Sequence, residues 1–379
     1  MFFSSIIGQD QLKGALVSDA RTGRVPHAQL FLGPEGSGAL GLAMAYAAYL
    51  QCEAPRETDS CGQCRACLKS HKLIHPDVHF SYPTVGTKAI CTEVLPEWRL
   101  AIAEERSYLS LNKWLNRLDA ENKQGNINTD ETRDINRKLS LMAFEGRHKI
   151  LLMWLPEFLG KEGNRLLKLI EEPPDETIFI LVAENQELIL PTILSRCQLV
   201  KVPSLSDEEV ALGLEKLEGI ERTEAERIAF LSEGNLARAL EMAEDKNGDH
   251  AQLFLEWLRT AYQQKAALLV QWVDKIAGAS PVGDRRWGRK DQKFLLEYGG
   301  HFLRELLMAV ALEETRLRLP DAERETALKL ARILSIDQIE KIDALFNDCA
   351  LAVERNANPK ILFLDASIRL SAILHNKTA

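Results

Sequence analysis

The chain has 379 residues, 46% hydrophobic and 27% charged, a balance typical of a globular protein long enough for two or three domains. No apolar run approaches the roughly 18 residues of a membrane span, and residues 1–7 lack the features of a signal peptide, so we expect a cytoplasmic protein without membrane contact. The net charge of −8 argues against a protein that holds DNA mainly through its own electrostatics.

The first predicted elements are a strand, a glycine-rich loop and a helix. An apolar run over 28–32 predicts a buried parallel strand, and an alanine- and leucine-rich segment over 39–50 predicts the helix. Between them, 33–40 has the sequence GPEGSGAL where a phosphate-binding loop has G-x-x-x-x-G-K-[ST]. The glycines are kept, but alanine replaces the lysine and leucine the hydroxyl residue that phosphoryl transfer requires. The positions of this degenerate loop are Gly33, Gly36, Gly38, Ala39 and Leu40.

Four cysteines follow in the pattern C-x8-C-x2-C-x2-C. This spacing supplies four soft ligands suited to tetrahedral zinc, and a closed site of this kind would be structural. Disulfides are disfavoured in a cytoplasmic chain. Unligated thiols, or a ligand from His71, His75 or His79, remain as alternatives. The predicted zinc ligands are Cys52, Cys61, Cys64 and Cys67.

Strands and helices alternate again further along. We predict buried strands over 149–155 and 177–183, with a helix over 163–172 that two prolines end. This alternation indicates a parallel α/β sheet. The more charged segment 92–128 is expected to form helix and loop inserted at the sheet edge, with its two tryptophans as packing residues.

After about residue 203 the pattern is helical throughout. Capping-box patterns begin at Ser206 and Thr223, the polar stretch 245–250 is a predicted linker, and about five helices are expected beyond it. The expected domains are an α/β domain over 1–203 that contains the cysteine segment 52–67, a small helical domain over 204–246 and a larger helical domain over 251–379.

Five motifs fall in one order over about residues 4–240. They are Ile7-Gly8-Gln9, Pro26-His27-Ala28, the glycine loop, Leu166-Leu167-Lys168 with Glu171-Glu172-Pro173-Pro174, and Leu190-Pro191-Thr192-Ile193-Leu194-Ser195-Arg196-Cys197. Together they resemble the AAA+ clamp-loader family, whose bacterial members carry a zinc module where the cysteines lie. The resemblance implies a P-loop-type AAA+ α/β domain with an inserted zinc module, a helical lid domain and an all-α C-terminal collar domain.

The chain departs from the family at its catalytic positions. The resemblance places the acidic residues that hold Mg²⁺ and polarise water at Met153 and Trp154, and a sensor threonine at Ala183 or Glu184. Lysine, hydroxyl and both carboxylates are therefore absent together. Because phosphoryl transfer depends almost wholly on such charges, we expect no ATP hydrolysis by this chain.

Arg196 remains. Its place in Ser195-Arg196-Cys197 implies, by the resemblance, an arginine finger offered across a subunit interface to a neighbour's ATP. Guanidinium suits this role because it is permanently charged and can bridge phosphate oxygens.

The resemblance thus implies a non-hydrolysing clamp-loader subunit within a replicative DNA polymerase holoenzyme. Its expected partners are the ATPase subunits and the clamp-opening subunit, and, through the whole complex, the sliding clamp and primer-template DNA. An active AAA+ ATPase with an unusual phosphate loop is the main alternative. A zinc-dependent nucleic-acid binder is a third, but no basic patch interleaved with aromatic residues supports it.

Overall fold

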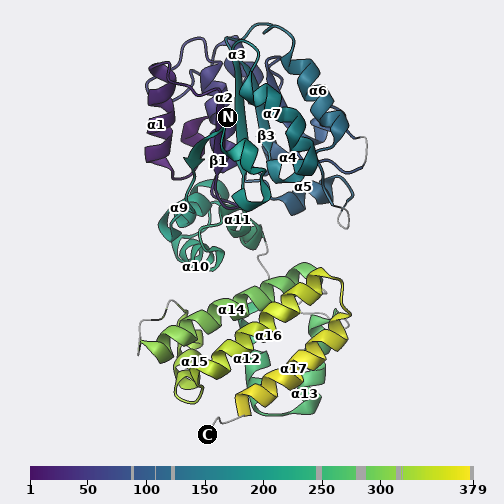
Figure 1. Ribbon diagram of the computed structural model, residues 1–379. Helices are drawn as coiled ribbons and strands as arrows, with labels where there is room; N and C mark the ends of the chain where they lie inside the picture. The colour runs from purple at the N-terminus through teal and green to yellow at the C-terminus, as the bar shows by residue number, and fades with distance from the viewer. Residues whose placement is uncertain are drawn as a thin grey trace. The chain divides into compact units, whose positions relative to one another are not determined.

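The computed structural model describes residues 1–86, 89–106, 108–120, 124–244, 250–278, 287–312, 317 and 319–375. The chain forms two compact units, Met1–Glu244 and Asp245–Ala379 (Figure 1). Apart from His250, the predicted linker at 245–250 lies outside the described residues.

The first unit is built on a five-stranded sheet, and all of its strand pairs are parallel. The strands lie in the order β2-β3-β4-β1-β5. They are β1 (Ala28–Leu32), β2 (Val78–Ser81), β3 (Lys149–Trp154), β4 (Thr177–Ala183) and β5 (Gln198–Lys201). The predicted parallel sheet and three of its strands are confirmed, whereas β2 and β5 were not predicted.

Both faces of the sheet are buried, and successive strand residues supply two different cores. Ile150, Leu152 and Trp154 of β3 belong to one hydrophobic cluster, while Leu151 and Met153 belong to the other. This alternation follows from the period of two residues along a strand. Because every residue is buried on one side or the other, β3 is apolar without interruption from Ile150 to Trp154.

Helices supply the other half of each core (Figure 1). On one face, the cluster includes residues of α1 (Asp10–Arg21), α2 (Ala39–Leu50), α4 (Leu95–Glu104) and α5 (Leu111–Arg117). On the other face, it includes residues of α6 (Thr129–Leu139), α7 (Gly163–Glu171) and α8 (Pro191–Leu194). The short elements are α3 (Arg65–His71) and the 3-10 turns η1 (Phe3–Ser5), η2 (Pro156–Glu162) and η3 (Gln186–Leu188).

The charged segment 92–128 contributes aromatic residues to the first core, as expected for its tryptophans. Trp98 stacks on Tyr82 with ring centroids 4.1 Å apart and meets Trp114 edge-on at 5.3 Å. The indole nitrogen of Trp114 donates a hydrogen bond of 2.7 Å to the carbonyl of Pro83. The segment is therefore anchored by its aromatic side chains.

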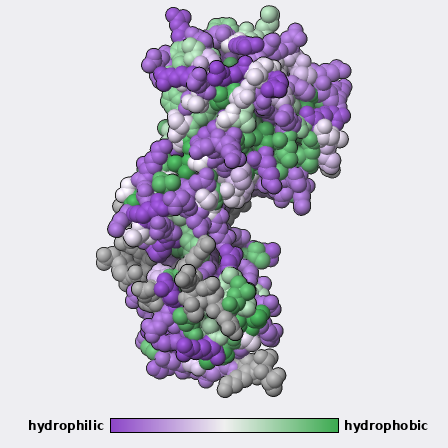
Figure 2. All heavy atoms as spheres, turned by 90° about the vertical axis from the view of Figure 1, so that its left-hand side faces the viewer, coloured by the Kyte–Doolittle hydropathy of each residue, from purple (hydrophilic) through white to green (hydrophobic). Residues whose placement is uncertain are grey.

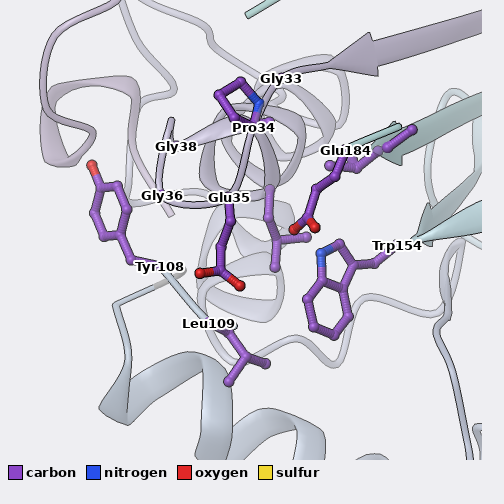
Figure 3. Close-up of a pocket in the computed structure, with 13 residues that line it drawn as sticks. Gly33, Pro34, Glu35, Gly36, Gly38, Tyr108, Leu109, Trp154 and Glu184 are labelled. Carbon is purple, nitrogen blue, oxygen red and sulfur yellow. The ribbon is translucent and has the colours of Figure 1, made fainter. Parts of the chain in front are cut away.

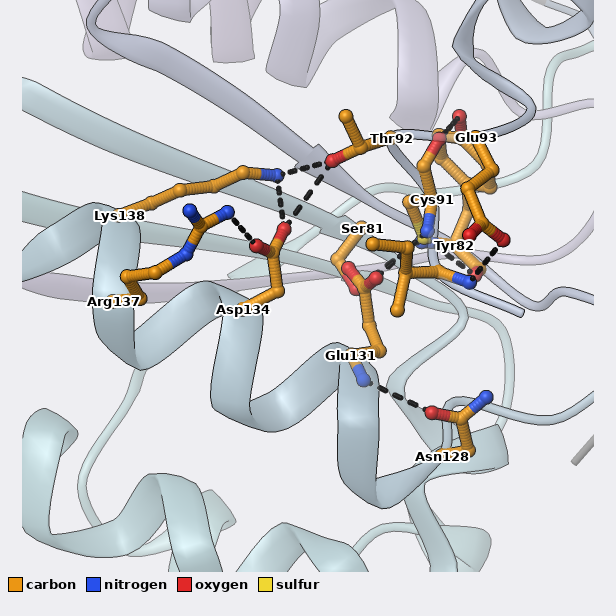
Figure 4. Close-up of polar contacts among 11 residues, drawn as sticks. Ser81, Tyr82, Cys91, Thr92, Glu93, Asn128, Glu131, Asp134, Arg137 and Lys138 are labelled. Atoms are coloured by element: carbon orange, nitrogen blue, oxygen red, sulfur yellow. Dashed lines mark hydrogen bonds and ion pairs between the residues drawn. The ribbon is translucent and has the colours of Figure 1, made fainter. Parts of the chain in front are cut away.

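Polar contacts hold the loop before α4, at Cys91 and Thr92, against α6 (Figure 4). The fully buried carboxylate of Glu131 accepts a hydrogen bond of 2.7 Å from the amide of Cys91. The hydroxyl of Thr92 donates to Asp134 at 3.2 Å, and Lys138 pairs with the same carboxylate at 2.6 Å. The loop is thus fixed by groups that α6 presents one turn apart.

Three helices complete the first unit: α9 (Asp207–Glu218), α10 (Arg222–Ser232) and α11 (Leu236–Glu244). The capping box predicted at Ser206 is confirmed. The cap predicted at Thr223 is wrong, because α10 begins at Arg222 and its N-cap, Glu221, makes no side-chain cap bond. Arg222, the first residue of α10, pairs with carboxylates on α9 and α10, and the helix begins two residues earlier than predicted.

The described part of the second unit contains six helices, one more than expected. They are α12 (His250–Tyr262), α13 (Ala266–Ile276), α14 (Arg289–Ala311), α15 (Asp321–Ala331), α16 (Ile336–Glu354) and α17 (Pro359–His375). The turn between α12 and α13 has neither glycine nor proline, since Gln264 itself takes a left-handed conformation with φ +53°. A capping box at Ser335 begins α16.

A buried carboxylate fixes the loop between α6 and β3. Asp77, 3% exposed, accepts hydrogen bonds from the amides of Phe144 at 2.6 Å, Glu145 at 2.9 Å and Gly146 at 2.6 Å. Burial alone would raise the pKa of this carboxyl, but the three amides outweigh burial and lower it. The loop thus fixed exposes Met142, at 92%.

We expect Asp77→Asn to destabilise the protein by about 1.5–3 kcal/mol at pH 7, since an amide cannot accept all three bonds. The folded pKa of Asp77 lies below its usual value of 3.8. Its contribution is therefore present above about pH 4 and is lost as the pH falls through the folded pKa. Chemical denaturation at pH 7 and pH 3 should show the difference from wild type shrinking in acid. Asp175→Asn, at an exposed turn, is the control; a difference that does not depend on pH would contradict the assignment.

Candidate functional site

The glycine loop joins the carboxyl end of β1 to the start of α2, as the sequence predicts. Gly38 is the N-cap of α2 with φ +87°, and Gly36 has φ +75°. A Cβ at Gly36 would lie 1.9 Å from Oδ1 of Asn235, so a larger residue does not fit. The amide of Leu236 donates a hydrogen bond of 3.3 Å to the carbonyl of Gly36. The loop therefore lies directly against the start of α11.

The two residues that replace lysine and the hydroxyl residue are part of the core. Ala39 and Leu40 are 7% and 5% exposed and belong to the same hydrophobic cluster as Phe31 of β1. Neither offers a charge or a metal ligand. The loop thus keeps its glycines but lacks the lysine and hydroxyl side chains that a phosphate-binding loop uses.

The positions expected to carry catalytic carboxylates are also occupied by core residues. Met153 and Trp154 end β3 and are 0% and 2% exposed. The Trp154 ring lies 5.4 Å from that of Trp98. Figure 3 shows the indole of Trp154 lining the pocket beside the glycine loop. At this position, where the resemblance implies a group that polarises water, an aromatic ring completes the core.

The pocket at the loop is small because other side chains fill it. Its volume is about 20 Å³, enough for about one water, whereas pockets for small-molecule ligands typically measure about 300–1,000 Å³. Tyr108 and Leu109 line it (Figure 3). The Tyr108 hydroxyl accepts a hydrogen bond of 2.9 Å from the amide of Ile7, and its ring packs in the cluster that contains Leu214 of α9.

The charged groups that line the pocket are acidic (Figure 3). Desolvation, together with the nearby carboxylates of Glu35 and Glu157, raises the pKa of Glu184 to about 8. Glu35 accepts a hydrogen bond of 3.2 Å from the side-chain amide of Asn235. The raised pKa leaves Glu184 largely protonated at neutral pH, and no lysine or arginine lines this pocket in the described structure. The pocket therefore supplies no cation to neutralise phosphate and has little room for a nucleotide.

Arg196 lies just after α8, with its side chain 36% exposed. Its guanidinium pairs with Glu171, Nη2 to Oε1, at 2.5 Å. Nη1 donates to the carbonyl of Thr192 at 2.8 Å and to the hydroxyl of Ser195 at 3.1 Å. The side chain is ordered at the surface and reachable by a neighbouring molecule.

The four predicted cysteines come together between α2 and α3. The sulfur atoms of Cys52, Cys61, Cys64 and Cys67 all lie within 4.8 Å of one another. The Cys61 and Cys67 sulfurs are 3.8 Å apart, close to the roughly 3.8 Å that a tetrahedral ion with 2.3 Å bonds to sulfur requires. Hydrogen bonds from the amides of Gln63 and Cys64 lower the pKa of the Cys61 thiol to about 6. The donor set and spacing fit a metal ion.

Within the described parts of the chain, this group of candidate ligands contains only the four cysteines. His71 lies 2.9 Å from the amino terminus of Met1, and Nδ1 of His75 accepts a hydrogen bond of 3.2 Å from the amide of Asp77. The third histidine, His79, has its pKa lowered to about 4 by burial. His71 and His75 thus take part in other local contacts.

A parallel sheet with a glycine loop between its first strand and the next helix is shared by the class of nucleotide-binding α/β folds. Within that class, the chain belongs to the family described as DNA polymerase III, delta subunit, whose model matches residues 8–206. The predicted membership of the AAA+ clamp-loader family is thereby confirmed.

Curated relatives carry related names. DNA polymerase III subunit delta' of Escherichia coli (strain K12) is 28% identical over 187 residues, which are 48% of this chain and 44% of the relative. The delta' subunit of Pseudomonas aeruginosa is 29% identical over 178 residues, covering 46% and 43%. DNA polymerase III subunit gamma of Buchnera aphidicola is 26% identical over 249 residues, covering 64% and 58%. The matches thus span about half of the length of these relatives.

Among solved structures, a gamma subunit-related protein of DNA polymerase III from Thermotoga maritima aligns with a TM-score of 0.42 at 15% identity, over 95% of this chain and 99% of that chain. Where the structure describes this chain, none of its helices combines the length and apolarity that crossing a membrane requires.

Sequence reasoning did not identify every residue that shapes the pocket. Tyr108, Leu109 and Glu35 line it, and no local pattern distinguishes them. Tyr108 comes from the charged segment and reaches the loop only through the tertiary fold. The signal that was available, an aromatic residue in that segment, indicates packing but not where the ring packs.

We expect the purified chain to show no saturable binding of ATP with Mg²⁺, with any dissociation constant weaker than about 1 mM. The measurement is isothermal titration calorimetry. Glu35→Gln combined with Glu184→Gln should remain negative, because these changes remove charge without opening the pocket. Saturable binding by wild type would contradict the prediction. Binding by the double variant alone would show that charge, rather than volume, excludes nucleotide.

Proposed function

We propose that the chain is a non-hydrolysing, delta-prime-type subunit of a replicative clamp-loader complex that donates Arg196 to the ATP of a neighbouring subunit. The observation that carries the proposal is the replacement of four catalytic positions by core residues. Leu40, Met153 and Trp154 are each at most 5% exposed. A single lost group can be replaced from a neighbouring loop, but four losses leave the pocket without its chemistry.

The charge of the pocket supports the same proposal. Phosphoryl transfer needs cations around the γ-phosphate, and the residues that line the pocket in the described structure include neither lysine nor arginine. Its acidic members, Glu35 and Glu184, cannot supply the positive charge that is required. We propose accordingly that the chain acts on nucleotide only through a neighbour.

Arg196 has the properties that this role requires. A guanidinium stays charged at every physiological pH and presents donors in a planar fork that matches phosphate oxygens. Arg196 is partly exposed and oriented by three contacts. An arginine finger supplied in trans is worth about 10³–10⁵ in rate.

We expect Arg196→Ala to lower the clamp-stimulated ATPase of the assembled complex. Turnover should fall by about 10³-fold or more at the served site, which is the ATP site of the neighbouring subunit that Arg196 would contact. The measurement is steady-state ATP hydrolysis by a complex reconstituted with the ATPase subunits, the sliding clamp and primed DNA. Arg133→Ala, an exposed arginine of α6, is the matched control. Unchanged turnover would remove the finger assignment, and ATP hydrolysis by the purified chain alone would favour the active-ATPase alternative.

The second unit is proposed to be the collar through which the chain joins the other subunits, and α9 to α11 the lid. One face of α17 is apolar and exposed, with Ile361 at 69% and Ile368 at 62%, and Leu351 of α16 is 52% exposed. Figure 2 shows hydrophobic patches in the mostly hydrophilic surface of the face that it presents. Exposed apolar area of this kind supports an oligomerisation role.

The cysteine cluster is proposed to hold a structural zinc ion. Four thiolates leave no open coordination position for a substrate, and the cluster lies in a segment of 52–67 whose only regular element is the start of α3. When bound, zinc would tie this segment to the end of α2. Hydrogen bonds from backbone amides to Cys52, Cys61 and Cys64 hold their sulfurs in place for it.

We expect one equivalent of zinc per purified chain, measured by elemental analysis. Strong chelators should lower the melting temperature, because metal binding adds directly to folding free energy. Cys61→Ser should lose the zinc, whereas Cys349→Ser, in the helical C-terminal unit, should retain it. Metal-free protein with unchanged stability would contradict the assignment.

A further inference from the structure

Packing in the core brings the ends of α7 and α8 together. Ile170 of α7 and Ile193 of α8 are each 1% exposed and share one hydrophobic cluster. The helices approach closely: a Cβ at Gly163 would lie 2.8 Å from a methyl carbon of Leu190. Glu171 ends α7, and Arg196 is the second residue after the end of α8. The placement of these two charged residues therefore follows from the buried contacts beside them.

Three contacts fix the guanidinium of Arg196 and leave part of it available. Nη1 donates to Thr192 and Ser195, and Nη2 pairs with Glu171 at 2.5 Å. A guanidinium has five N–H donors, so these contacts leave the donor on Nε and one donor on Nη2. Two such donors can bridge two phosphate oxygens. The anchoring of Arg196 is thus compatible with binding an anion.

Electrostatics explain why the ion pair of Glu171 and Arg196 forms and why a stronger anion can displace it. A carboxylate at a helix carboxyl terminus is unfavourable with the helix dipole, and a cation beside it compensates; Glu171 and Arg196 stand in this relation at the end of α7. Both side chains are partly exposed, 43% and 36%. Ion pairs with this exposure are weak, so Glu171 orients the guanidinium without holding it against a stronger anion.

We propose that Glu171 is a positioning residue for Arg196. By restricting the guanidinium to one orientation, Glu171 lowers the entropy that must be lost when Arg196 engages a phosphate of the neighbouring subunit. This inference rests on the proposed role of Arg196 as a finger. It adds that the first glutamate of the Glu171-Glu172-Pro173-Pro174 segment acts through Arg196 and not on nucleotide itself.

The test uses the reconstituted complex, with kcat and KM for ATP measured for five variants of this chain. Glu171→Ala should lower kcat at the served site roughly two- to fivefold, the range expected for one exposed ion pair, with KM unchanged. Glu171→Gln keeps an oxygen acceptor for Nη2 and should restore most of the rate. Glu172→Ala removes the adjacent exposed carboxylate and should match wild type. Arg196→Ala and the double variant Glu171→Ala/Arg196→Ala should have the same low rate.

The outcomes separate this inference from the proposed function. If Arg196→Ala lowers the rate but Glu171→Ala does not, the positioning role is overturned and the finger stands. If Glu171→Ala lowers the rate further in the Arg196→Ala background, Glu171 acts independently of Arg196 and the inference is also overturned. If Arg196→Ala changes nothing, the finger assignment itself fails. A raised KM for Glu171→Ala would instead indicate a role in nucleotide affinity and would contradict positioning.

Discussion

Burial of both faces of the parallel sheet is the constraint on which the rest of the first unit depends. Because side chains alternate between two cores, no residue of β3 or β4 is free to be polar without cost. Parallel strands also place their carboxyl ends at one edge, which brings Gly33, Trp154 and Glu184 into one pocket. The character of that pocket is then decided by a few residues that follow or end the strands.

Much of this arrangement could be predicted from the sequence because its signals are local. Mostly apolar runs identify β1, β3 and β4, and the glycine spacing identifies the loop between β1 and α2. The edge strands lack such a signal. β2 has the sequence VHFS, and in β5 only Val200 is buried. A strand with one or two buried residues depends on its neighbours, which sequence periodicity does not report.

The candidate sites differ in the same way. The cysteine cluster was predictable because its ligands lie close together in the chain and chemistry alone limits what they can do. The small size of the pocket at the glycine loop was not predictable, because Tyr108 belongs to a segment distant in sequence. It packs at the pocket through contacts with Ile7 and α9. Likewise, the pairing of Glu171 with Arg196 depends on how α7 and α8 pack, although each residue belongs to a recognisable motif.

The core residues at the ends of β3 and the start of α2 have a thermodynamic consequence. A protein that binds a ligand only when folded gains stability with ligand concentration, so an ATPase subunit changes its folding free energy as its nucleotide exchanges. If this chain binds no nucleotide, as we propose, Trp154 and Leu40, packed at 2% and 5% exposure, stabilise it equally at every nucleotide concentration. In the proposed clamp-loader complex, its folding free energy would then stay constant while that of the neighbouring ATPase subunits changes with their nucleotide.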